Sequence, residues 1–264
     1  MTKIIAIANQ KGGVGKTTSV INIGTGLATE GKRVLLIDLD PQGNLTLGLG
    51  YDSDELEYTI SELLAEMAAK RPLPDDLSPF ILHNDEGVDL LPSDMNLEEV
   101  QPAMQFMVGG QGNYLLKQLI ERLDEGYDYV LIDCPPSIAA LTYNALIAAD
   151  AVIIPSQAQA FSAKGSSQLF QHIQRVKNEL NPSLEIMGIL ITMLTERSIN
   201  ERKCIKAVKT IFGDDVTVFT SKIPRSVHAG SSNYDGVSIY RFDPDGKVAS
   251  AYRGCVREVL HGGI

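Results

Sequence analysis

Cysteine and histidine are scarce in this sequence and are nowhere clustered. The 264 residues include three cysteines, Cys134, Cys204 and Cys255, and four histidines, all far apart. No CxxC pair or other metal-ligand spacing links them, and zinc sites depend on such clusters. A nucleophile elbow is absent as well. We therefore interpret the cysteines as buried or incidental thiols and predict neither a zinc site nor a serine-hydrolase site.

Long apolar runs are also missing. No segment approaches the roughly 20 residues that cross a bilayer, and the first residues lack the basic-plus-apolar pattern of a secretion signal. With 44% hydrophobic residues, the chain is long enough for one large core. We expect a single soluble domain over residues 1–264, a cytoplasmic location and no membrane partner.

Positive charge is in deficit, but only locally. The formal net charge is −10, and residues 51–100 alone hold 14 acidic against 2 basic side chains. The other parts of the chain are therefore slightly basic. Because salt screens a charged patch over about 10 Å at 0.1 M, an acidic segment does not exclude a basic DNA-binding face elsewhere. We interpret residues 51–112 as an acidic, variable lobe of the same domain.

The strongest positive signal is a glycine-rich loop between a predicted strand and a predicted helix. The apolar run 4–8 precedes the loop KGGVGKTT at 11–18, and a helical pattern follows over 18–30. Glycines in such a loop let successive backbone N–H groups point at a phosphate, and the dipole of the following helix favours the same anion. Lys16 would then reach the β- and γ-phosphates, and the Thr17 hydroxyl would ligate Mg²⁺.

The loop departs from the usual P-loop pattern at its first position. That pattern requires a glycine five residues before Gly15, where this sequence has Gln10, and a second lysine, Lys11, lies inside the loop. A lysine at this place is the mark of the deviant Walker A ATPases, a group that the sequence resembles. The other interpretation is a tight strand-to-helix turn with a chance lysine.

Two further apolar runs end in carboxylates. Residues 34–37 lead into DLDPQGN at 38–44, and the run that begins at Tyr129 ends in Asp133. Such runs are typical of strands covered on both faces, and ligands bind at the C-terminal edge of parallel sheets. A carboxylate such as Asp40 could orient an attacking water, or Asp38 could simply cap the turn. Asp133 is interpreted as a Walker B aspartate that holds the hydration shell of Mg²⁺.

The order of the predicted elements indicates the fold class. Strands and helices alternate, which favours an α/β domain with a doubly wound, mainly parallel sheet flanked by helices. A polar segment with no predicted helix covers 92–112. Predicted helices cover 18–30, 60–67, 114–123, 138–148, 162–180 and 249–260, and predicted strands cover 4–8, 34–37, 88–91, 129–133, 151–155 and 186–192.

The charge changes sign after residue 192. Between 197 and 225 there are seven basic residues against three acidic ones, and Arg202, Lys206 and Lys209 share the outer face of a helical pattern. Such a face could contact DNA phosphates without reading bases, or it could be an ordinary solvated helix surface. The composition of the stretch favours neither interpretation.

Four motifs together resemble the ParA-type partition ATPases, in the small form without an N-terminal helix-turn-helix domain. They are KGGVGKTT at 11–18, DLDPQGN at 38–44, LIDCPPS at 131–137 and IPRSV at 223–227, and the resemblance covers most of the chain. It implies a deviant P-loop ATPase fold, ATP and Mg²⁺ as cofactors, and slow, partner-stimulated hydrolysis. It also implies an ATP-dependent homodimer that binds DNA non-specifically on the nucleoid, a ParB-like centromere-binding partner, and a role in plasmid or chromosome partition.

The resemblance assigns roles to individual residues as well. Lys11 would cross a nucleotide-sandwich dimer to the partner's ATP, Lys16 would hold phosphate, and Asp40 would position the hydrolytic water, which makes these the implied catalytic residues. Thr17 and, through water, Asp133 would hold Mg²⁺. The implied nucleotide contacts are Lys11, Gly12, Gly13, Val14, Gly15, Lys16, Thr17, Thr18 and Pro224, and the implied DNA contacts are Arg197, Lys222 and Arg225.

The sequence departs from this family pattern in two further places. Residues 228–234 replace the common serine-glutamate-alanine-proline continuation, and Gln157 and Gln159 stand in a loop where an acidic residue is frequent. These changes weaken the transfer of partner contacts more than the transfer of nucleotide chemistry.

Two other function classes remain open on the sequence. A MinD-like membrane-positioning ATPase shares the loop but needs a basic amphipathic C-terminal helix, whereas residues 252–264 are short, broken by glycines and modestly charged. A metabolic P-loop enzyme, either an iron–sulfur protein or an ATP-dependent ligase, is the other class, and Cys134 alone is poor support for a shared cluster. The sequence leaves open the cargo, the identity of the partner and the role of residues 51–112.

Overall fold

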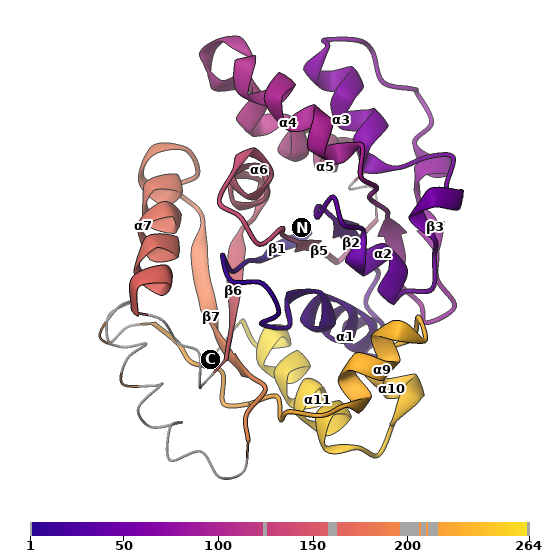
Figure 1. Ribbon diagram of the computed structural model, residues 1–264, viewed down its shortest axis with the longest axis vertical. Coiled ribbons are helices and arrows are strands. Elements are labelled where there is room, and N and C mark those ends of the chain that lie inside the picture. Colours follow the sequence, from indigo (N-terminus) through magenta and orange to yellow (C-terminus); the bar gives the residue numbers. More distant parts are fainter. Residues whose placement is uncertain are drawn as a thin grey trace.

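A seven-stranded sheet forms the centre of the molecule, in the order β3-β4-β2-β5-β1-β6-β7 (Figure 1). The computed structural model describes residues 2–123, 126–157, 163–195, 206, 210 and 216–262. Neighbouring strands pair in parallel except β3 and β4, which form an antiparallel edge. The mainly parallel sheet that the sequence predicts is therefore confirmed. The strands are β1 (Lys3–Ile7), β2 (Val34–Asp38), β3 (Leu82–His83), β4 (Asp89–Leu91), β5 (Tyr129–Asp133), β6 (Ala151–Gln157) and β7 (Glu185–Thr192).

Helices cover both faces of this sheet (Figure 1). One layer consists of α3 to α7, and the other contains α1, α2, α10 and α11, with the short α9 beside α2 and α10. The described helices are α1 (Lys16–Thr29), α2 (Asn44–Gly48), α3 (Ile60–Ala68), α4 (Leu97–Phe106), α5 (Leu115–Leu123), α6 (Ala140–Ala148), α7 (Ala163–Glu179), α9 (His228–Tyr234), α10 (Ile239–Phe242) and α11 (Lys247–Leu260), with 3₁₀ turns η1 (Ser53–Glu55), η2 (Ser78–Phe80) and η3 (Val108–Tyr114).

The apolar strands divide their side chains between the two helical layers, because successive residues of a strand point to opposite faces. In β1, Ile5 and Ile7 pack with α1 and α11, whereas Ala6 joins the core on the other face. Leu36 and Leu35 of β2 divide in the same way. All five side chains are fully buried. Burial on both faces explains why these strands are continuous apolar runs in the sequence.

The register of the central strands brings their C-terminal ends to one edge of the sheet. Ile7, the last residue of β1, pairs with Asp133 of β5, and Asp133 pairs with Asp38 of β2. The glycine loop follows β1 directly. Loop and carboxylates therefore meet at the edge where a doubly wound sheet binds its ligands.

Residues 51–112 contain more regular structure than the sequence predicts. Helix α4 forms in the polar segment 92–112, for which the sequence predicts no element, and its residues Leu97, Val100 and Met104 are buried. Their spacing is helical, but Pro102 inside the helix hides the pattern, because proline usually ends or kinks a helix. Strand β4 joins the central sheet. The interpretation of this segment as a variable lobe stays a prediction.

The C-terminal helix α11 is part of the core. Its apolar residues Val248, Tyr252 and Val256 are buried in the layer that contains α1. Within the part of the chain that the structure describes, no helix is both long enough and apolar enough to cross a membrane.

Candidate functional site

The glycine loop connects β1 to α1 with two residues in a left-handed conformation. Gly13 and Gly15 have φ values of +68° and +86°, which residues with a Cβ rarely adopt. Gly15 is also the N-cap of α1, and no side chain caps this helix end. The first-turn amides and the positive end of the helix dipole are therefore available to an anion.

Two side chains from neighbouring strands hold the loop in place. Thr192, the last residue of β7, donates a hydrogen bond from its hydroxyl to the Val14 carbonyl at 2.8 Å. The side-chain amide of Gln157 donates to the Gly13 carbonyl at 2.6 Å. The sequence predicted Gln157 in a loop, but it is the last residue of β6. An amide suits this position because it donates a hydrogen bond to a carbonyl, which a carboxylate cannot do.

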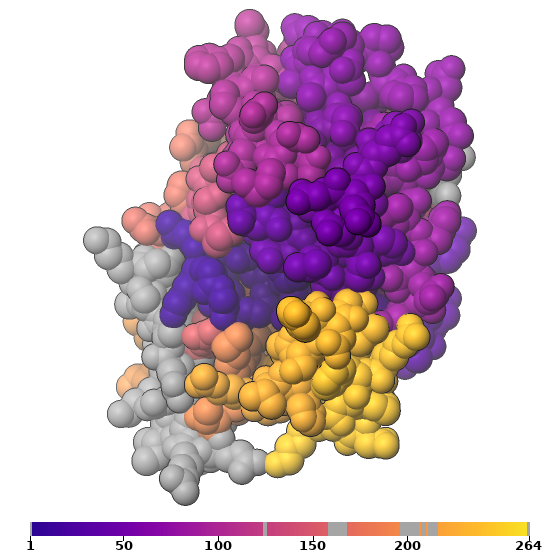
Figure 2. Space-filling model, turned by 45° about the vertical axis from the view of Figure 1, so that its right-hand side comes forward, coloured from indigo at the N-terminus to yellow at the C-terminus, as the bar shows by residue number. Residues whose placement is uncertain are grey.

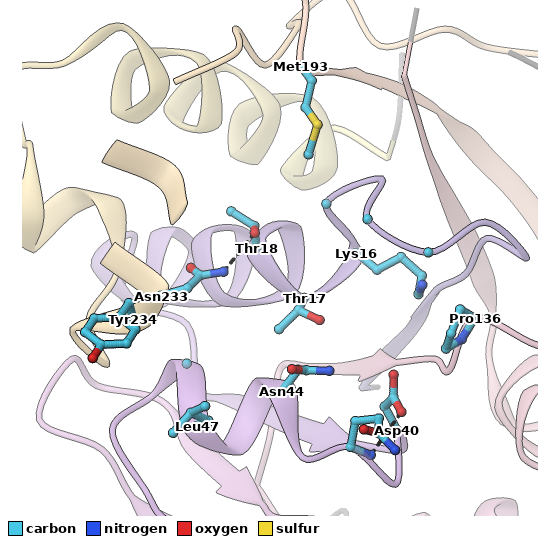
Figure 3. A pocket seen from close by; sticks show the side chains of 15 residues that line it. Lys16, Thr17, Thr18, Asp40, Asn44, Leu47, Pro136, Met193, Asn233 and Tyr234 are labelled. Carbon is cyan, nitrogen blue, oxygen red and sulfur yellow. Dashed lines mark hydrogen bonds between the residues drawn. The ribbon is translucent and has the colours of Figure 1, made fainter. Parts of the chain in front are cut away.

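A cavity of about 510 Å³ lies in front of the loop. Three parts of the chain meet on the face shown in Figure 2. They are the indigo N-terminal residues, the violet residues that follow them, and orange residues of the C-terminal third. Lys16 is only 7% exposed, and its side chain lies toward Asp40 and Pro136, while Tyr234 lies at the opposite end (Figure 3). The predicted site residues that line the cavity are Gly12, Gly13, Gly15, Lys16, Thr17, Thr18 and Asp40.

Thr17 and Asp133 form the pair that the sequence assigns to Mg²⁺. The Thr17 hydroxyl donates to Oδ2 of Asp133 at 2.6 Å. Asp133 is 1% exposed, and its Oδ1 atom has no hydrogen-bond partner among the described residues. Burial and the charge of Asp38 raise the pKa of Asp133 well above its usual range, while Thr17 and the charge of Lys16 oppose this shift. A buried, unpaired carboxylate oxygen beside a hydroxyl fits the hydration shell of a divalent cation, which would supply the missing positive charge.

Asp38 and Asp40 have different environments. The fully buried Asp38 accepts hydrogen bonds from the N–H and the hydroxyl of Thr46, both at 2.9 Å, and from the N–H of Asp40 at 3.1 Å. Burial raises the pKa of Asp38 to about 6, although these hydrogen bonds lower it. Asp40 lines the cavity, and its Oδ1 accepts from the N–H of Gln42 at 3.1 Å. Asp38 therefore holds the turn that leads into α2, and Asp40 is the carboxylate at the cavity.

Lys11 and Val14 lie outside the lining of this cavity. Lys11 is exposed, and its backbone N–H donates to the side chain of Asn9 at 3.0 Å. Val14 is 1% exposed and contributes to the buried core behind the loop. Of the residues expected to contact nucleotide in the loop, these two therefore do not line the cavity of their own chain.

Several residues of the cavity have no counterpart in the sequence predictions. Leu47 of α2 and Tyr234 of α9 are 57% and 89% exposed, and Met193 follows β7. Asn233 donates a hydrogen bond from its side-chain amide to the Thr18 hydroxyl at 2.9 Å (Figure 3). A local pattern could not reveal this contact, because 215 positions separate the two residues.

Comparison with known proteins connects this geometry to a family. The profile of a family described as an AAA domain matches residues 2–186. The chromosome partitioning protein ParA of Caulobacter vibrioides is 40% identical over 266 residues, which cover 98% of this chain and 94% of that protein. The sporulation initiation inhibitor protein Soj of Bacillus subtilis is 38% identical, with 100% of both chains covered. This chain belongs to the ParA/Soj family of partition ATPases.

The similarity of this ParA/Soj chain extends to solved structures with bound nucleotide. The crystal structure of cobyrinic acid a,c-diamide synthase from Mycobacterium smegmatis, with a bound ATP analogue and magnesium, has a TM-score of 0.84 and 35% identity. The match covers 99% of this chain and 95% of the synthase chain. The family and the P-loop fold that the four motifs predict are thus confirmed.

The ParA/Soj residues expected to contact DNA are only partly within the described chain. Lys222 and Arg225 lie in segment 216–225, in which Val218 forms a parallel bridge with Ile189 of β7 and Pro224 forms one with Leu194, just after β7. Arg225 is exposed. Arg197 lies outside the described residues, as do Gln159, Arg202, Lys203 and Lys209.

Pro224, which was expected to contact the nucleotide, lies apart from the glycine-loop cavity. It lines a second cavity of about 680 Å³ together with Arg225 and His228. The backbone that leads to Pro224 is held by Glu258, a buried residue of α11. Its carboxylate accepts hydrogen bonds from the backbone N–H groups of Thr220 and Ser221, both at 2.7 Å.

Proposed function

We propose that this chain is an ATP-driven switch for plasmid or chromosome partition, which binds DNA without sequence preference in its ATP form. One observation carries the proposal: Lys16, Thr17 and Asp40 line a single cavity, and Asp133 accepts a hydrogen bond from Thr17. These side chains provide a cation for phosphate, a pair to hold Mg²⁺ and a carboxylate for water. Hydrolysis of a nucleoside triphosphate requires all three of these groups.

Hydrolysis would depend on the fixed position of Asp40. One oxygen of this carboxylate is held by the Gln42 N–H, and the residue is only 7% exposed, which limits the directions it can take. Asp40 would orient the attacking water, and Lys16 would hold the β- and γ-phosphates. Thr17 and Asp133 would hold Mg²⁺, which would supply positive charge to the phosphates. We expect slow hydrolysis that a ParB-like partner accelerates.

Lys11 would couple the nucleotide to dimerisation. Its side chain is exposed and lies outside the lining of its own cavity, so its ammonium group can complete the ATP site of a second copy. At 4 Å and an effective dielectric constant near 20, one lysine–phosphate pair contributes about 4 kcal/mol before desolvation. A coupling of this size shifts a dimer equilibrium by orders of magnitude.

Dimerisation would double the basic surface that meets DNA. Lys222 and Arg225 are the candidates in the described chain, and the basic residues from Arg197 to Lys209 extend the same stretch of sequence. If the dimer contacts about six phosphates, the logarithm of its DNA affinity falls with the logarithm of salt concentration with a slope of about −5. The protein would then associate with the nucleoid in the cytoplasm, under control of its nucleotide.

Binding of non-cognate DNA, measured without nucleotide, with ADP and with ATP and Mg²⁺, tests this function. We expect the protein to bind DNA with ATP and Mg²⁺, but not with ADP or without nucleotide. We also expect the Asp40→Ala variant to accumulate as a DNA-bound dimer, because it binds ATP but does not hydrolyse it. Arg225→Ala should weaken DNA binding and leave ATP affinity unchanged. Arg71→Ala, an exposed arginine of the acidic segment, is the matched control.

Three outcomes would contradict parts of the proposal. Absent or nucleotide-independent DNA binding would refute the switch. An Asp40→Ala protein that stays monomeric with ATP would remove the assigned role of Asp40. A Lys11→Ala protein that dimerises normally with ATP would show that Lys11 does not complete a second site.

An ATP-dependent ligase is the second candidate, because the Mycobacterium smegmatis structure, at 35% identity, is that of a diamide synthase. ATP turnover that requires a carboxylic acid and a nitrogen donor, and that DNA does not affect, would favour it.

Two other classes, an iron–sulfur protein and a membrane-positioning ATPase, have less support. Cys134 is 1% exposed, and burial raises the pKa of its thiol, so it is poorly placed to share an iron–sulfur cluster. The apolar side of α11 packs in the core and is not available to a membrane surface.

A further inference from the structure

Thr18, the last residue of the glycine-loop motif, is held by two asparagines. The side-chain amide of Asn22, one turn further along α1, donates to the Thr18 carbonyl at 2.7 Å. The side-chain amide of Asn233, from α9, donates to the Thr18 hydroxyl at 2.9 Å (Figure 3). Thr18 and Asn233 both line the cavity. The hydroxyl of Thr18 therefore has a fixed partner at the cavity wall.

The direction of this hydrogen bond determines where the Thr18 proton points. A threonine hydroxyl has one donor position and two acceptor positions. The N–H of Asn233 occupies one acceptor position, so the proton of the hydroxyl is not donated to Asn233 and can be donated to another acceptor, such as one in the cavity that Thr18 lines. In the function proposed above, the acceptor beside Thr18 is a phosphate of the bound nucleotide.

The segment that carries Asn233 is itself fixed on α1 and α2. Just after α9, a Cβ on Gly236 would lie 2.5 Å from the Cα of Gly50, so the two backbones are in close contact. The N–H of Ile239 then donates to Oδ1 of Asn22 at 2.8 Å. These contacts hold the turn after α9, so the amide of Asn233 does not have to be ordered when a ligand arrives.

We infer that Asn233 is a positioning residue for nucleotide binding, because it directs the Thr18 hydroxyl at a phosphate oxygen. The inference rests on the proposed function and gives a task to residues 228–234, where this chain departs from the family pattern. Oδ1 of Asn233 has no hydrogen-bond partner among the described residues. The bond to Thr18 is therefore the contact through which the Asn233 side chain acts.

A double-mutant cycle on nucleotide affinity tests the inference. Asn233→Ala should weaken the binding of Mg–ATP and Mg–ADP by about 3- to 10-fold, the value of one ordinary hydrogen bond. In a Thr18→Val background, which lacks the hydroxyl, Asn233→Ala should change the affinity by less than about twofold. Asn233→Asp should weaken binding more than Asn233→Ala, because a carboxylate accepts the Thr18 proton and turns it away from the phosphate.

Ser231→Ala is the matched control, since Ser231 is an exposed residue of the same helix. The melting temperature of each variant reports on folding, and if Asn233→Ala folds poorly, Asn233→Asp keeps the shape of the side chain and serves in the same cycle. An equal loss of affinity in both backgrounds, or no loss in the wild-type background, would overturn the inference. If the wild-type protein binds no adenine nucleotide, the proposed function fails together with the inference, whereas a missing coupling with intact wild-type binding removes the inference alone.

Discussion

The buried carboxylate of Asp38 should make the ligand-free protein less stable as the pH rises from about 4 to about 6. Asp38 has no exposed surface, and burial raises its pKa from 3.8 to about 6. Below both pKa values Asp38 is protonated in the folded and the unfolded chain, so its ionisation does not change the free energy of unfolding. Above both values the folded chain holds a charge that the unfolded chain holds at lower cost. The difference corresponds to about 3 kcal/mol at 1.36 kcal/mol per pKa unit, and it develops across this pH window.

Asp38→Asn isolates this contribution. Asparagine keeps an oxygen that can accept from Thr46, cannot ionise, and loses the hydrogen bond from the Asp40 N–H. We expect the free energy of unfolding of wild type, relative to the variant, to fall by about 2 kcal/mol between pH 4.5 and pH 7.5. The charge of Asp38 also raises the pKa of Asp133, and relief of that effect acts in the same direction.

Urea unfolding of both proteins at the two pH values, without nucleotide or Mg²⁺, measures the effect. Other titrating groups are the same in both proteins and cancel in the difference. If the stability difference is equal at both pH values, Asp38 is ionised in the folded protein at pH 4.5 and the argument from burial is wrong. A difference that moves in favour of wild type at high pH would show that the hydrogen bonds to Asp38 outweigh its desolvation.

Three further predictions concern two glycines with positive φ, a contact that holds the glycine loop and a buried hydrogen bond. Gly31→Ala should lower the free energy of unfolding by about 1–2 kcal/mol, because Gly31 has φ +76° and open space around it, whereas Gly236→Ala should cost about 2–5 kcal/mol, because its Cβ also meets the backbone of Gly50. Urea unfolding compares them, and equal losses would contradict the close contact. Gln157→Glu should weaken Mg–ATP binding at least about fivefold, because it leaves the Gly13 carbonyl without its donor. An unchanged affinity in a nucleotide titration would show that Gln157 does not hold the loop. Tyr252→Phe should cost about 1 kcal/mol, because Tyr252 and Ser19 share a buried hydrogen bond of 3.2 Å. A melting temperature equal to that of wild type would refute this assignment.

The parts of the site that the sequence predicts are those that lie close together in the chain. Gly13, Gly15 and Lys16 belong to one loop, and its conformation follows from the residues themselves, because glycine adopts positive φ and a helix begins directly afterwards. Asp38 and Asp133 each end an apolar strand. A parallel sheet places such strand ends at one edge, so their proximity follows from the fold class alone.

The parts that the sequence does not predict depend on contacts between distant segments. Gln157 and Thr192 reach the loop from the ends of β6 and β7, and Asn233 reaches it from α9. The sequence marks Gln157 and residues 228–234 as departures from the family pattern, but none of these residue types is unusual in a loop or at a strand end, so only the folded chain shows what they contact. Helix α4 is missed for a local reason, since Pro102 resembles a helix break.

Helix α9 connects the two ends of the proposed switch. It begins three residues after Arg225, a candidate for DNA contact, and its Asn233 bonds to Thr18 at the glycine loop. The turn that follows it packs on Gly50, which lies shortly after α2, the helix that Asp40 precedes. A nucleotide beside Thr18, with its attacking water held by Asp40, would therefore act on α1 and on the turn that leads into α2, the two helices that hold α9. We expect a change at either helix to reach the segment that carries Arg225, because closely packed elements transmit strain. Nucleotide control of DNA binding would then require no contact between the nucleotide and the DNA-binding residues.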